Sequence, residues 1–295
     1  MTAATNQIEL IDRRGLLPPL ATAIDDLAQQ VNTATGAVDG IARASILMPA
    51  MLGDEGKRSY LVVGQNNSEW RSLGGMLGAM FIVNTNKGKL EFTDFKAETD
   101  FPAFTKPVME LPKERLELFH PNPALKVQNT TQIPNFAESA KISQTAWKKR
   151  TGTKVDGVIA IDPVTLAYLL EATGPVKVPV SANGATKTLT TDNAVSFILN
   201  EVYNGYPNEV QDAILHAATA AAFEKIMEGK AEPRALLDAL AKAAGERRIL
   251  IWSDDKAEQA ALDGTKLQGA LPVTDANNTR FGVYVNDGTG SKLSY

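Results

Sequence analysis

The sequence predicts an α/β fold, with a sheet covered by helices on both faces and further helices before it. Segments with the two-residue period of strands alternate with segments of helical period through most of the chain. Residues 155–161 are apolar enough for an interior strand that is covered on both faces. Directly afterwards, Asp162 and Pro163 provide the start signal of a helix, and Gly174-Pro175 provides its stop.

The N-terminal part predicts helices. Apolar residues recur at roughly helical spacing from residue 8 to about residue 51. We therefore expect a helical lead-in over residues 1–52, followed by one α/β domain over residues 53–295. The sequence ends at Tyr295 in what looks like the middle of a strand, so we expect the domain to be truncated there.

The remaining elements follow from local patterns. Residues 60–63 and 79–83 have strand character, and a turn at 86–89 joins the second of these to a strand at 90–95. Further helices are expected at residues 137–150, 190–203, 209–227 and 233–245. Further strands are expected at 176–180, 248–252 and 281–285. Interleaved strands and helices of this kind are typical of layered α/β folds.

Composition limits the possible functions. A formal net charge of −4 leaves no excess of Lys and Arg for a phosphate backbone, so we expect no nucleic-acid partner. There is no Cys, and only His120 and His216 could act as imidazole ligands, so we expect neither thiolate catalysis, a metal site nor a cofactor. No signal peptide and no run long enough to span a bilayer is evident. The protein is therefore cytosolic, or the sequence begins after its anchor.

The segment between the first two expected strands is the strongest candidate site. It combines neutral amides, one carboxylate, one guanidinium and closely spaced glycines, namely Gln65, Asn66, Asn67, Glu69, Arg71, Gly74 and Gly75. Loops positioned by a rigid sheet often carry function, and glycines allow a ligand to approach the backbone. The structural alternative is a polar hairpin with a solvated tip.

Three stretches resemble a known family. They are Tyr60-Leu-Val-Val-Gly-Gln-Asn-Asn followed by Arg71-Ser72, residues 155–176, and residues 189–199. Together they are similar to the DUF4012 family of bacterial envelope proteins, and more distantly the same order looks like the LytR-CpsA-Psr domain, whose members move lipid-linked glycopolymers onto the wall. The resemblance implies a layered fold around a central mixed sheet. It also implies an extracytoplasmic location, a membrane anchor outside this soluble chain, and an envelope polysaccharide as partner.

Departures from the distant family favour a different reaction. That family has Arg-Ser-Asp-Thr, whose aspartate helps to hold magnesium, whereas this chain has Arg71-Ser72-Leu73-Gly74. The later Arg-x-Arg pair of the family is replaced by residues 200–203, which include Glu201. A carboxylate at that position would repel a pyrophosphate. The leading hypothesis is therefore a metal-independent glycoside hydrolase or transglycosylase that acts on envelope polysaccharide, possibly wall arabinan.

In this hypothesis Glu69 and Glu201 form the catalytic carboxylate pair. Arg71 and neutral amides, including Asn129, would bind sugar hydroxyls, and Asp162 lies at the expected site unless it serves only as a helix cap. Two alternatives stay open. One is a LytR-CpsA-Psr-type phosphotransferase that joins lipid-linked glycopolymer to the wall. The other is a non-catalytic glycan-binding module, which Asn129 and Asn135 would favour. The segment 286–292 resembles an ion-binding loop only superficially and is expected to be a turn.

Overall fold

The computed structural model describes residues 22–26, 28–29, 43, 45–181, 183–276 and 279–288. The chain divides into two compact units, Met1–Met51 and Leu52–Tyr295. In the first unit the described residues are helical. Most of the expected lead-in lies outside the described residues, so the division into a helical lead-in and one α/β domain stays a prediction.

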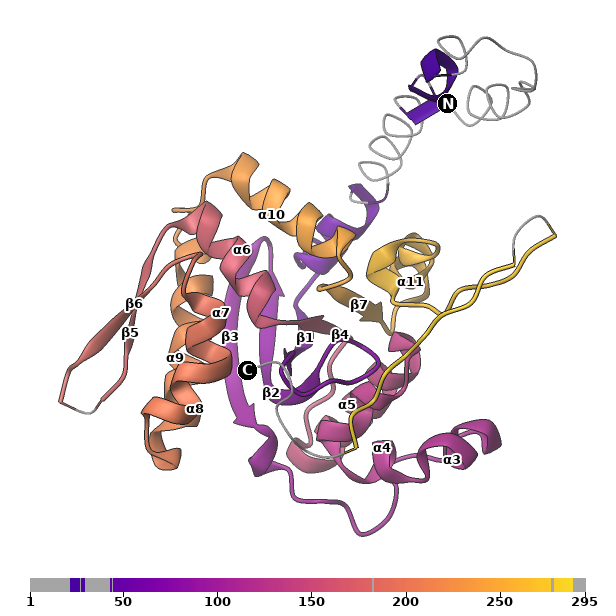
Figure 1. The fold of residues 1–295 in the computed structure, drawn as a ribbon, viewed down its shortest axis with the longest axis horizontal. Coiled ribbons are helices and arrows are strands. Elements are labelled where there is room, and N and C mark those ends of the chain that lie inside the picture. The colour runs from indigo at the N-terminus through magenta and orange to yellow at the C-terminus, as the bar shows by residue number, and fades with distance from the viewer. Residues whose placement is uncertain are drawn as a thin grey trace. The chain divides into compact units, whose positions relative to one another are not determined.

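The second unit is built on a five-stranded mixed sheet with the order β3-β2-β1-β4-β7 (Figure 1). Its strands are β1 (Arg58–Asn66), β2 (Met76–Asn86), β3 (Lys89–Ala97), β4 (Gly157–Ile161) and β7 (Leu250–Ser253). Strands β1 and β4 run parallel, and the other neighbours are antiparallel. The predicted fold class, a mixed sheet within an α/β fold, is confirmed.

The other elements connect these strands. The described helices of the second unit are η1 (Glu98–Asp100), α3 (Lys113–Phe119), α4 (Asn122–Leu125), η2 (Val127–Gln132), α5 (Phe136–Thr151), α6 (Pro163–Thr173), α7 (Ala194–Ser196), η3 (Phe197–Glu201), α8 (Val202–Gly205), α9 (Asn208–Met227), α10 (Pro233–Gly245), α11 (Lys256–Leu262) and η4 (Lys266–Gln268). A separate two-stranded sheet consists of β5 (Val176–Pro179) and β6 (Thr186–Leu189).

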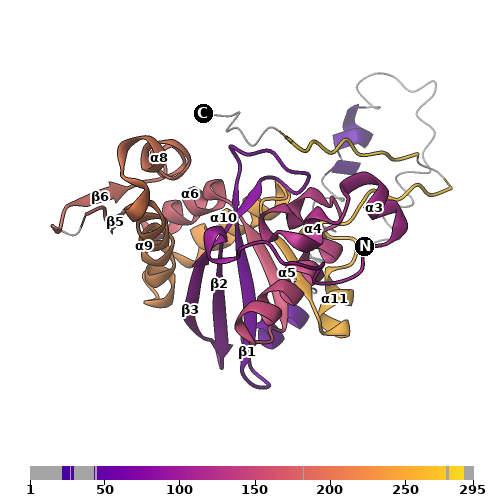
Figure 2. The same ribbon diagram turned by 90° about the horizontal axis from the view of Figure 1, so that it is seen from below.

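The two faces of the large sheet are covered differently. Leu61 and Val63 of β1 belong to a core that includes Trp147 of α5. Side chains alternate along a strand, so Gly64 lies on the opposite face. Helices α6, α8 and α9 lie on that side of the sheet and α5 on the other (Figure 2). A second core joins α6, β5, β6 and α9. Helices therefore cover both faces, as predicted.

Strand β4 is an interior strand, between β1 and β7, as predicted. Val158 is fully buried and Ala160 nearly so. A Cβ atom at Gly157 would lie 2.5 Å from the carbonyl oxygen of Trp252 in β7. Glycine is therefore required for β4 to approach its neighbour this closely.

Helix α6 begins and ends where the sequence predicted. The Asp162 carboxylate accepts a hydrogen bond from the backbone N–H of Thr165 at 2.7 Å, and Pro163 occupies the first turn. Gly174, with φ of 73°, ends the helix. These local signals needed no tertiary information.

Two elements differ in the structure from what the sequence predicted. The helix expected at residues 190–203 starts only at Ala194, because Thr190 donates its backbone N–H to the Asn193 side chain and forms a turn first. The strand expected at 281–285 is extended, but it has no ladder partner among the described residues, and Phe281 and Val283 are more than four-fifths exposed. Alternating apolar residues predicted a strand, yet a strand also needs a neighbour to pair with.

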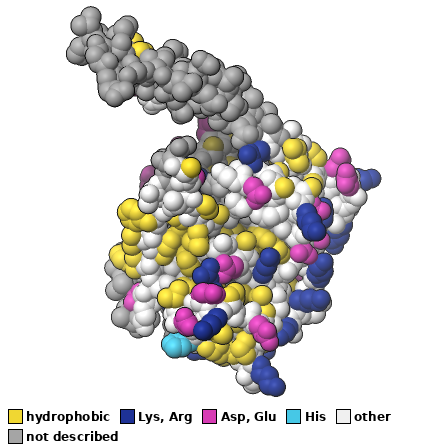
Figure 3. All heavy atoms as spheres, turned by 90° about the vertical axis from the view of Figure 1, so that its right-hand side faces the viewer, with side chains coloured by type: hydrophobic (Ala, Val, Ile, Leu, Met, Phe, Trp, Pro, Cys, Tyr) yellow, Lys and Arg dark blue, Asp and Glu magenta, His cyan; other side chains and the backbone are white. Residues whose placement is uncertain are grey.

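The surface shows mixed charge on the face drawn in Figure 3. Lys and Arg side chains are interspersed there with Asp and Glu side chains. Opposite charges placed so closely largely cancel one another's long-range potential.

We expect Gly157→Ala to lower the free energy of unfolding by about 1–3 kcal/mol, the usual cost of forcing an extra carbon into a packed interior. Urea denaturation would measure it. Gly205→Ala is the matched control, because a Cβ atom there meets nothing within 4 Å. Equal midpoints for wild type and Gly157→Ala would contradict the close approach of β4 to β7.

Candidate functional site

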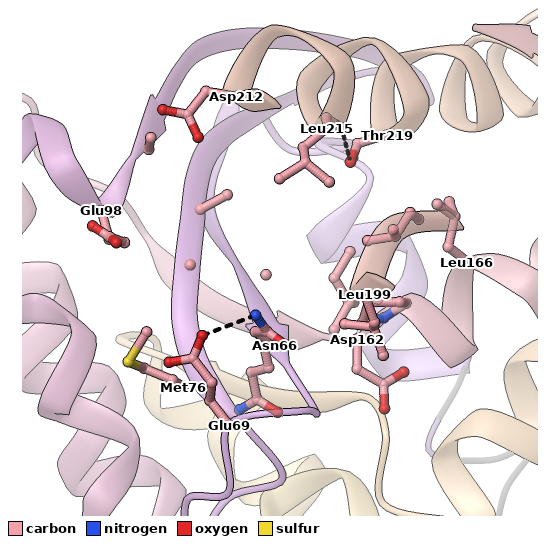
Figure 4. Close-up of a pocket in the computed structure, with 18 of the residues that line it drawn as sticks. Asn66, Glu69, Met76, Glu98, Asp162, Leu166, Leu199, Asp212, Leu215 and Thr219 are labelled. Atoms are coloured by element: carbon pink, nitrogen blue, oxygen red, sulfur yellow. Dashed lines mark hydrogen bonds between the residues drawn. The ribbon is translucent and has the colours of Figure 1, made fainter. Parts of the chain in front are cut away.

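A cavity of about 250 Å³ lies between the sheet and the helices α6, α8 and α9, which cover one of its faces (Figure 4). Its walls are mostly apolar and come from distant parts of the sequence, namely Met76, Phe81, Phe95, Ile161, Leu166, Ile198, Leu199 and Leu215. Its polar lining consists mainly of Gln65, Asn66, Glu69, Glu98, Asp162, Tyr203, Asp212 and Thr219. We call this space the cavity.

The end of β1 forms one side of the cavity. A register shift between Gly64 and Gln65 interrupts the ladder with β2 at this point, and such bulges often lie beside functional sites. Gln65 is 5% exposed, and its Nε2 is buried without a hydrogen-bond partner among the described residues. An unpartnered buried donor is costly, so it offers a bond to a polar ligand atom.

Asn66 organises the turn that follows β1. Its Oδ1 accepts hydrogen bonds from the backbone N–H and the hydroxyl of Ser68, at 3.1 and 2.6 Å. Its Nδ2 donates to Glu69 Oε1 at 3.2 Å, which holds that carboxylate at the cavity wall (Figure 4). Asn66 is therefore a structural link as well as a lining residue.

A π turn, η3, shapes the opposite wall. Such turns insert one extra residue into a helix and are frequent at functional sites. Leu199 and Tyr203, four residues apart, both line the cavity. Glu201 lies between them in the sequence, and its carboxylate pairs with Lys187 of β6 at 2.7 Å. Glu201 is not among the residues that line the cavity.

The charged groups that line the cavity are all acidic among the described residues. Burial, together with Asp212 and Glu69, raises the pKa of Glu98. Burial and the same field, from Glu69, Asp212 and Glu98, raise the pKa of Tyr203 to about 12. The interior of the cavity therefore disfavours additional negative charge.

Asp162 is the exception, because its charge is compensated. One carboxylate oxygen caps α6, and the other accepts from Asn67 Nδ2 at 3.0 Å and from Arg248 Nη1 at 2.7 Å. Arg248 also contacts Glu246 at 2.6 Å. Asp162 thus ties the loop after β1 to α6 and to the start of β7, and all of these bonds are structural.

The loop between β1 and β2 lies beside the cavity. Gly75 packs so closely against the backbone of Asn66 that a Cβ atom would have no room, and Gly74 has φ of 119°. These glycines fold the loop and do not line the cavity. Arg71 donates from Nη1 to the carbonyls of Trp70 and Asp287, at 2.9 and 2.7 Å. Its Nη2 lies 3.7 Å from the sulfur of Met76, which lines the cavity.

The structure thus separates the predicted site residues into groups. Gln65, Asn66, Glu69 and Asp162 line the cavity, while Asn67, Arg71, Gly74 and Gly75 form the adjoining loop. Asn129 lies in η2 and Glu201 at the end of η3, and neither lines the cavity. Asn135 caps α5.

Sequence reasoning missed Glu98, Asp212 and Tyr203. Glu98 directly follows β3, which is a weak signal for a residue at the edge of a sheet. Asp212 and Tyr203 reach the cavity only through the packing of α8 and α9 over the sheet, and the sequence contains no local signal for that.

The fold and site define a layered α/β protein with an apolar, acid-lined cavity at the end of its central strand. More particularly, the chain belongs to the family described as protein of unknown function DUF4012, which matches residues 55–203, just over half of the sequence. The predicted family resemblance is confirmed. No curated protein matches the sequence.

Several solved structures resemble this one at low identity. Protein gbs0355 from Streptococcus agalactiae is 16% identical, with a TM-score of 0.47 over 72% of this chain and 74% of its own. A LytR-Csp2A-Psr enzyme from Actinomyces oris is 15% identical, with a TM-score of 0.42 over 76% and 84%. TagU from Bacillus subtilis is 8% identical, with a TM-score of 0.41 over 72% and 81%.

The expectation of a glycoside hydrolase or transglycosylase is wrong. The structures similar to this chain include a LytR-Csp2A-Psr enzyme, and none of those described above is named as a glycoside hydrolase. The geometry agrees with this correction, because Glu69 lines the cavity whereas Glu201 is paired with Lys187 outside it. Leu199 and Tyr203 line the cavity, whereas Glu201, which lies between them in the sequence, does not. Among the described helices none has the length and hydropathy to cross a bilayer.

We expect Glu98→Gln to stabilise the fold more at pH 7 than at pH 4. The pKa of Glu98 is raised in the folded state, so the native protein binds this proton more tightly than the unfolded chain, and wild-type stability falls as the pH rises through that range. Glutamine does not titrate, so the variant lacks this loss of stability. Urea denaturation at both pH values measures the free energy of unfolding, with Glu91→Gln on the exposed side of β3 as control. A greater stabilisation by Glu98→Gln at pH 4 than at pH 7 would contradict the raised pKa of Glu98.

Proposed function

We propose that the protein binds a lipid-linked glycopolymer of the bacterial envelope and transfers it to a wall acceptor, as a LytR-CpsA-Psr-type phosphotransferase. The observation that carries this proposal is a cavity with apolar walls and a polar end beside an arginine. This arrangement suits a ligand with an apolar chain and a polar head. The protein from Actinomyces oris with a similar fold is named as a LytR-Csp2A-Psr enzyme, which is consistent with this proposal. The proposed activity lies outside the cytoplasm.

The apolar chain would occupy the cavity. Its walls are aliphatic and aromatic side chains from β2, β3, α6, η3 and α9. Each methylene group that leaves water contributes about 0.8 kcal/mol, so even a short segment of chain would be held firmly. A second hollow of about 200 Å³ shares Phe81, Phe95 and Thr219 with the cavity and could take the continuation of a longer chain.

The phosphate-bearing head would lie at the loop between β1 and β2. The carboxylates inside the cavity repel phosphate, whereas the Arg71 guanidinium lies behind Met76 at the cavity wall. The amides of Gln65 and Asn67 lie at the same end and suit sugar hydroxyls. Attraction at the loop and repulsion within the cavity would fix the direction in which the ligand enters.

The described residues do not form a metal site of their own. Among the described residues, no group of three or more His, Asp or Glu side chains is placed to hold a metal ion. Leu73, where the distant family has a magnesium ligand, is 6% exposed and belongs to the core. We therefore assign no step to a metal.

Transfer would proceed by attack of an acceptor hydroxyl on the phosphorus next to the sugar. A new P–O bond forms, and the bond from that phosphorus to the oxygen of the lipid phosphate breaks. The lipid monophosphate leaves with the bonding electrons. Glu69, held by Asn66 at the cavity wall, is the carboxylate we assign to accept the hydroxyl proton.

A non-catalytic glycan-binding protein is the second candidate. It is favoured by the acidic lining and by the two backbone carbonyls that already occupy Arg71. Incubation of the purified protein with a radiolabelled lipid-linked glycan and wall acceptor distinguishes the two. Label on the wall supports transfer, while binding of the lipid without transfer supports the second candidate.

We expect Glu69→Gln to lower the transfer rate about 100-fold or more while leaving lipid binding unchanged, because general-base catalysis typically contributes that much. Glu201→Gln is the matched comparison and should keep the wild-type rate, since Glu201 lies outside the cavity. A wild-type rate in Glu69→Gln would remove Glu69 from the mechanism.

We expect Leu215→Trp, which fills the cavity, to weaken the binding of farnesyl diphosphate about tenfold or more, whereas Ala213→Trp should not. Leu215 lines the cavity from α9, and Ala213 is exposed on the same helix. The difference follows from the loss of room for the chain. Isothermal titration calorimetry measures both affinities. Equal affinity in the two variants would mean that the apolar chain of the ligand does not occupy the cavity.

A further inference from the structure

The described end of the chain is bonded to the loop between β1 and β2. Asn286 accepts a hydrogen bond at Oδ1 from the backbone N–H of Ser72, at 3.0 Å. Its Nδ2 donates to Ser72 Oγ at 2.8 Å and to the Gln132 carbonyl at 3.1 Å. The Asn286 side chain therefore joins this loop to η2 across more than 150 residues of sequence.

The next residue makes two backbone bonds to the same loop. The N–H of Asp287 donates to the carbonyl of Trp70 at 3.0 Å, and the carbonyl of Asp287 accepts from Arg71 Nη1 at 2.7 Å. Asp287 is 8% exposed, so these bonds are shielded from water. The whole contact falls within the 286–292 segment that the sequence predicts as a plain turn.

These bonds leave the Nε–Nη2 edge of the Arg71 guanidinium without a strong acceptor among the described residues. Nη1 is held by two carbonyls, those of Trp70 and Asp287. Nε is buried and has no hydrogen-bond partner among the described residues, and Nη2 donates to the sulfur of Met76 at 3.7 Å, a weak acceptor that a phosphate oxygen would replace. A guanidinium binds a phosphate best through two parallel N–H groups on one edge. Anchoring of Nη1 fixes the direction of the opposite edge, toward the wall of the cavity.

We propose that Asn286 is a positioning residue, which holds Ser72 and the backbone of Asp287 so that Arg71 presents its Nε–Nη2 edge to the phosphate of the ligand. This inference rests on the proposed function and adds to it the residue that confers selectivity for a phosphate head. Asn286 itself need not touch the ligand.

The test compares two probes that share an apolar chain and differ in the head. Farnesyl diphosphate has the apolar chain and a diphosphate head, and farnesol has the same chain without the phosphates. We expect Asn286→Ala to weaken farnesyl diphosphate binding about tenfold or more, because a charge-assisted pair depends strongly on geometry, and to leave farnesol affinity unchanged. Val283→Ala is the matched control, because Val283 belongs to the same segment and is 81% exposed.

A double-mutant cycle shows whether Asn286 acts through Arg71. Arg71→Lys keeps the charge and loses the planar fork, so it should also weaken farnesyl diphosphate selectively. In that background we expect Asn286→Ala to add less than about a twofold further loss, since coupled residues are not additive.

Three outcomes would overturn the inference. Equal weakening of both probes in Asn286→Ala would indicate a purely structural role. Full additivity with Arg71→Lys would mean that Asn286 acts independently of the guanidinium. Failure of the wild-type protein to bind either probe would overturn the proposed function, and this inference with it, whereas the first two outcomes leave the proposed function standing.

Discussion

The buried carboxylate of Asp162 is the interaction on which the cavity depends. Its side chain is 3% exposed, and it bonds to the first turn of α6, to the loop after β1 and to Arg248 ahead of β7. Burial acts to lower the pKa of Arg248, but hydrogen bonds to Glu246 and Asp162 outweigh it and raise that pKa. The loss of one partner from such a pair leaves the other buried and uncompensated. This residue thus joins the sheet to α6, and these elements form two walls of the cavity.

Charge divides the site into two regions. Inside the cavity, Glu69, Glu98 and Asp212 reinforce one another's fields. At the loop, the Arg71 guanidinium lies beside the lining residue Met76, and carbonyl groups fix its orientation. In the proposed complex, electrostatics would therefore act mainly on orientation, because apolar contact would supply most of the binding and is not directional. Such a division would give the carboxylates of this largely apolar cavity a role in orienting the ligand.

The parts of the fold that were predictable are those specified by local signals. The interior position of β4 follows from its apolar run, and the limits of α6 follow from Asp162, Pro163 and Gly174. Three of the candidate site residues, Gln65, Asn66 and Asp162, line the cavity because they end β1 or cap α6, and Glu69 lines it from the loop that follows β1. Glu201 was expected beside Glu69, but it lies outside the cavity and pairs with Lys187 of β6, a contact that depends on tertiary packing and that no local pattern marks. Glu98 and Asp212 meet only through tertiary packing, and Asn286 joins a loop more than 200 residues away.

The π turn also affects how this sequence can change over generations. A π turn amounts to one residue inserted into an α-helix, and the widened turn absorbs it, so the helical residues on both sides keep their rotation about the axis. Loss of a single codon within residues 197–201 could therefore restore a regular helix without turning Tyr203 out of the cavity. The same loss within the regular helix α9 would rotate every later residue of that helix by about 100°. Members of this lineage should therefore accept the loss of one residue in η3 more readily than in α9.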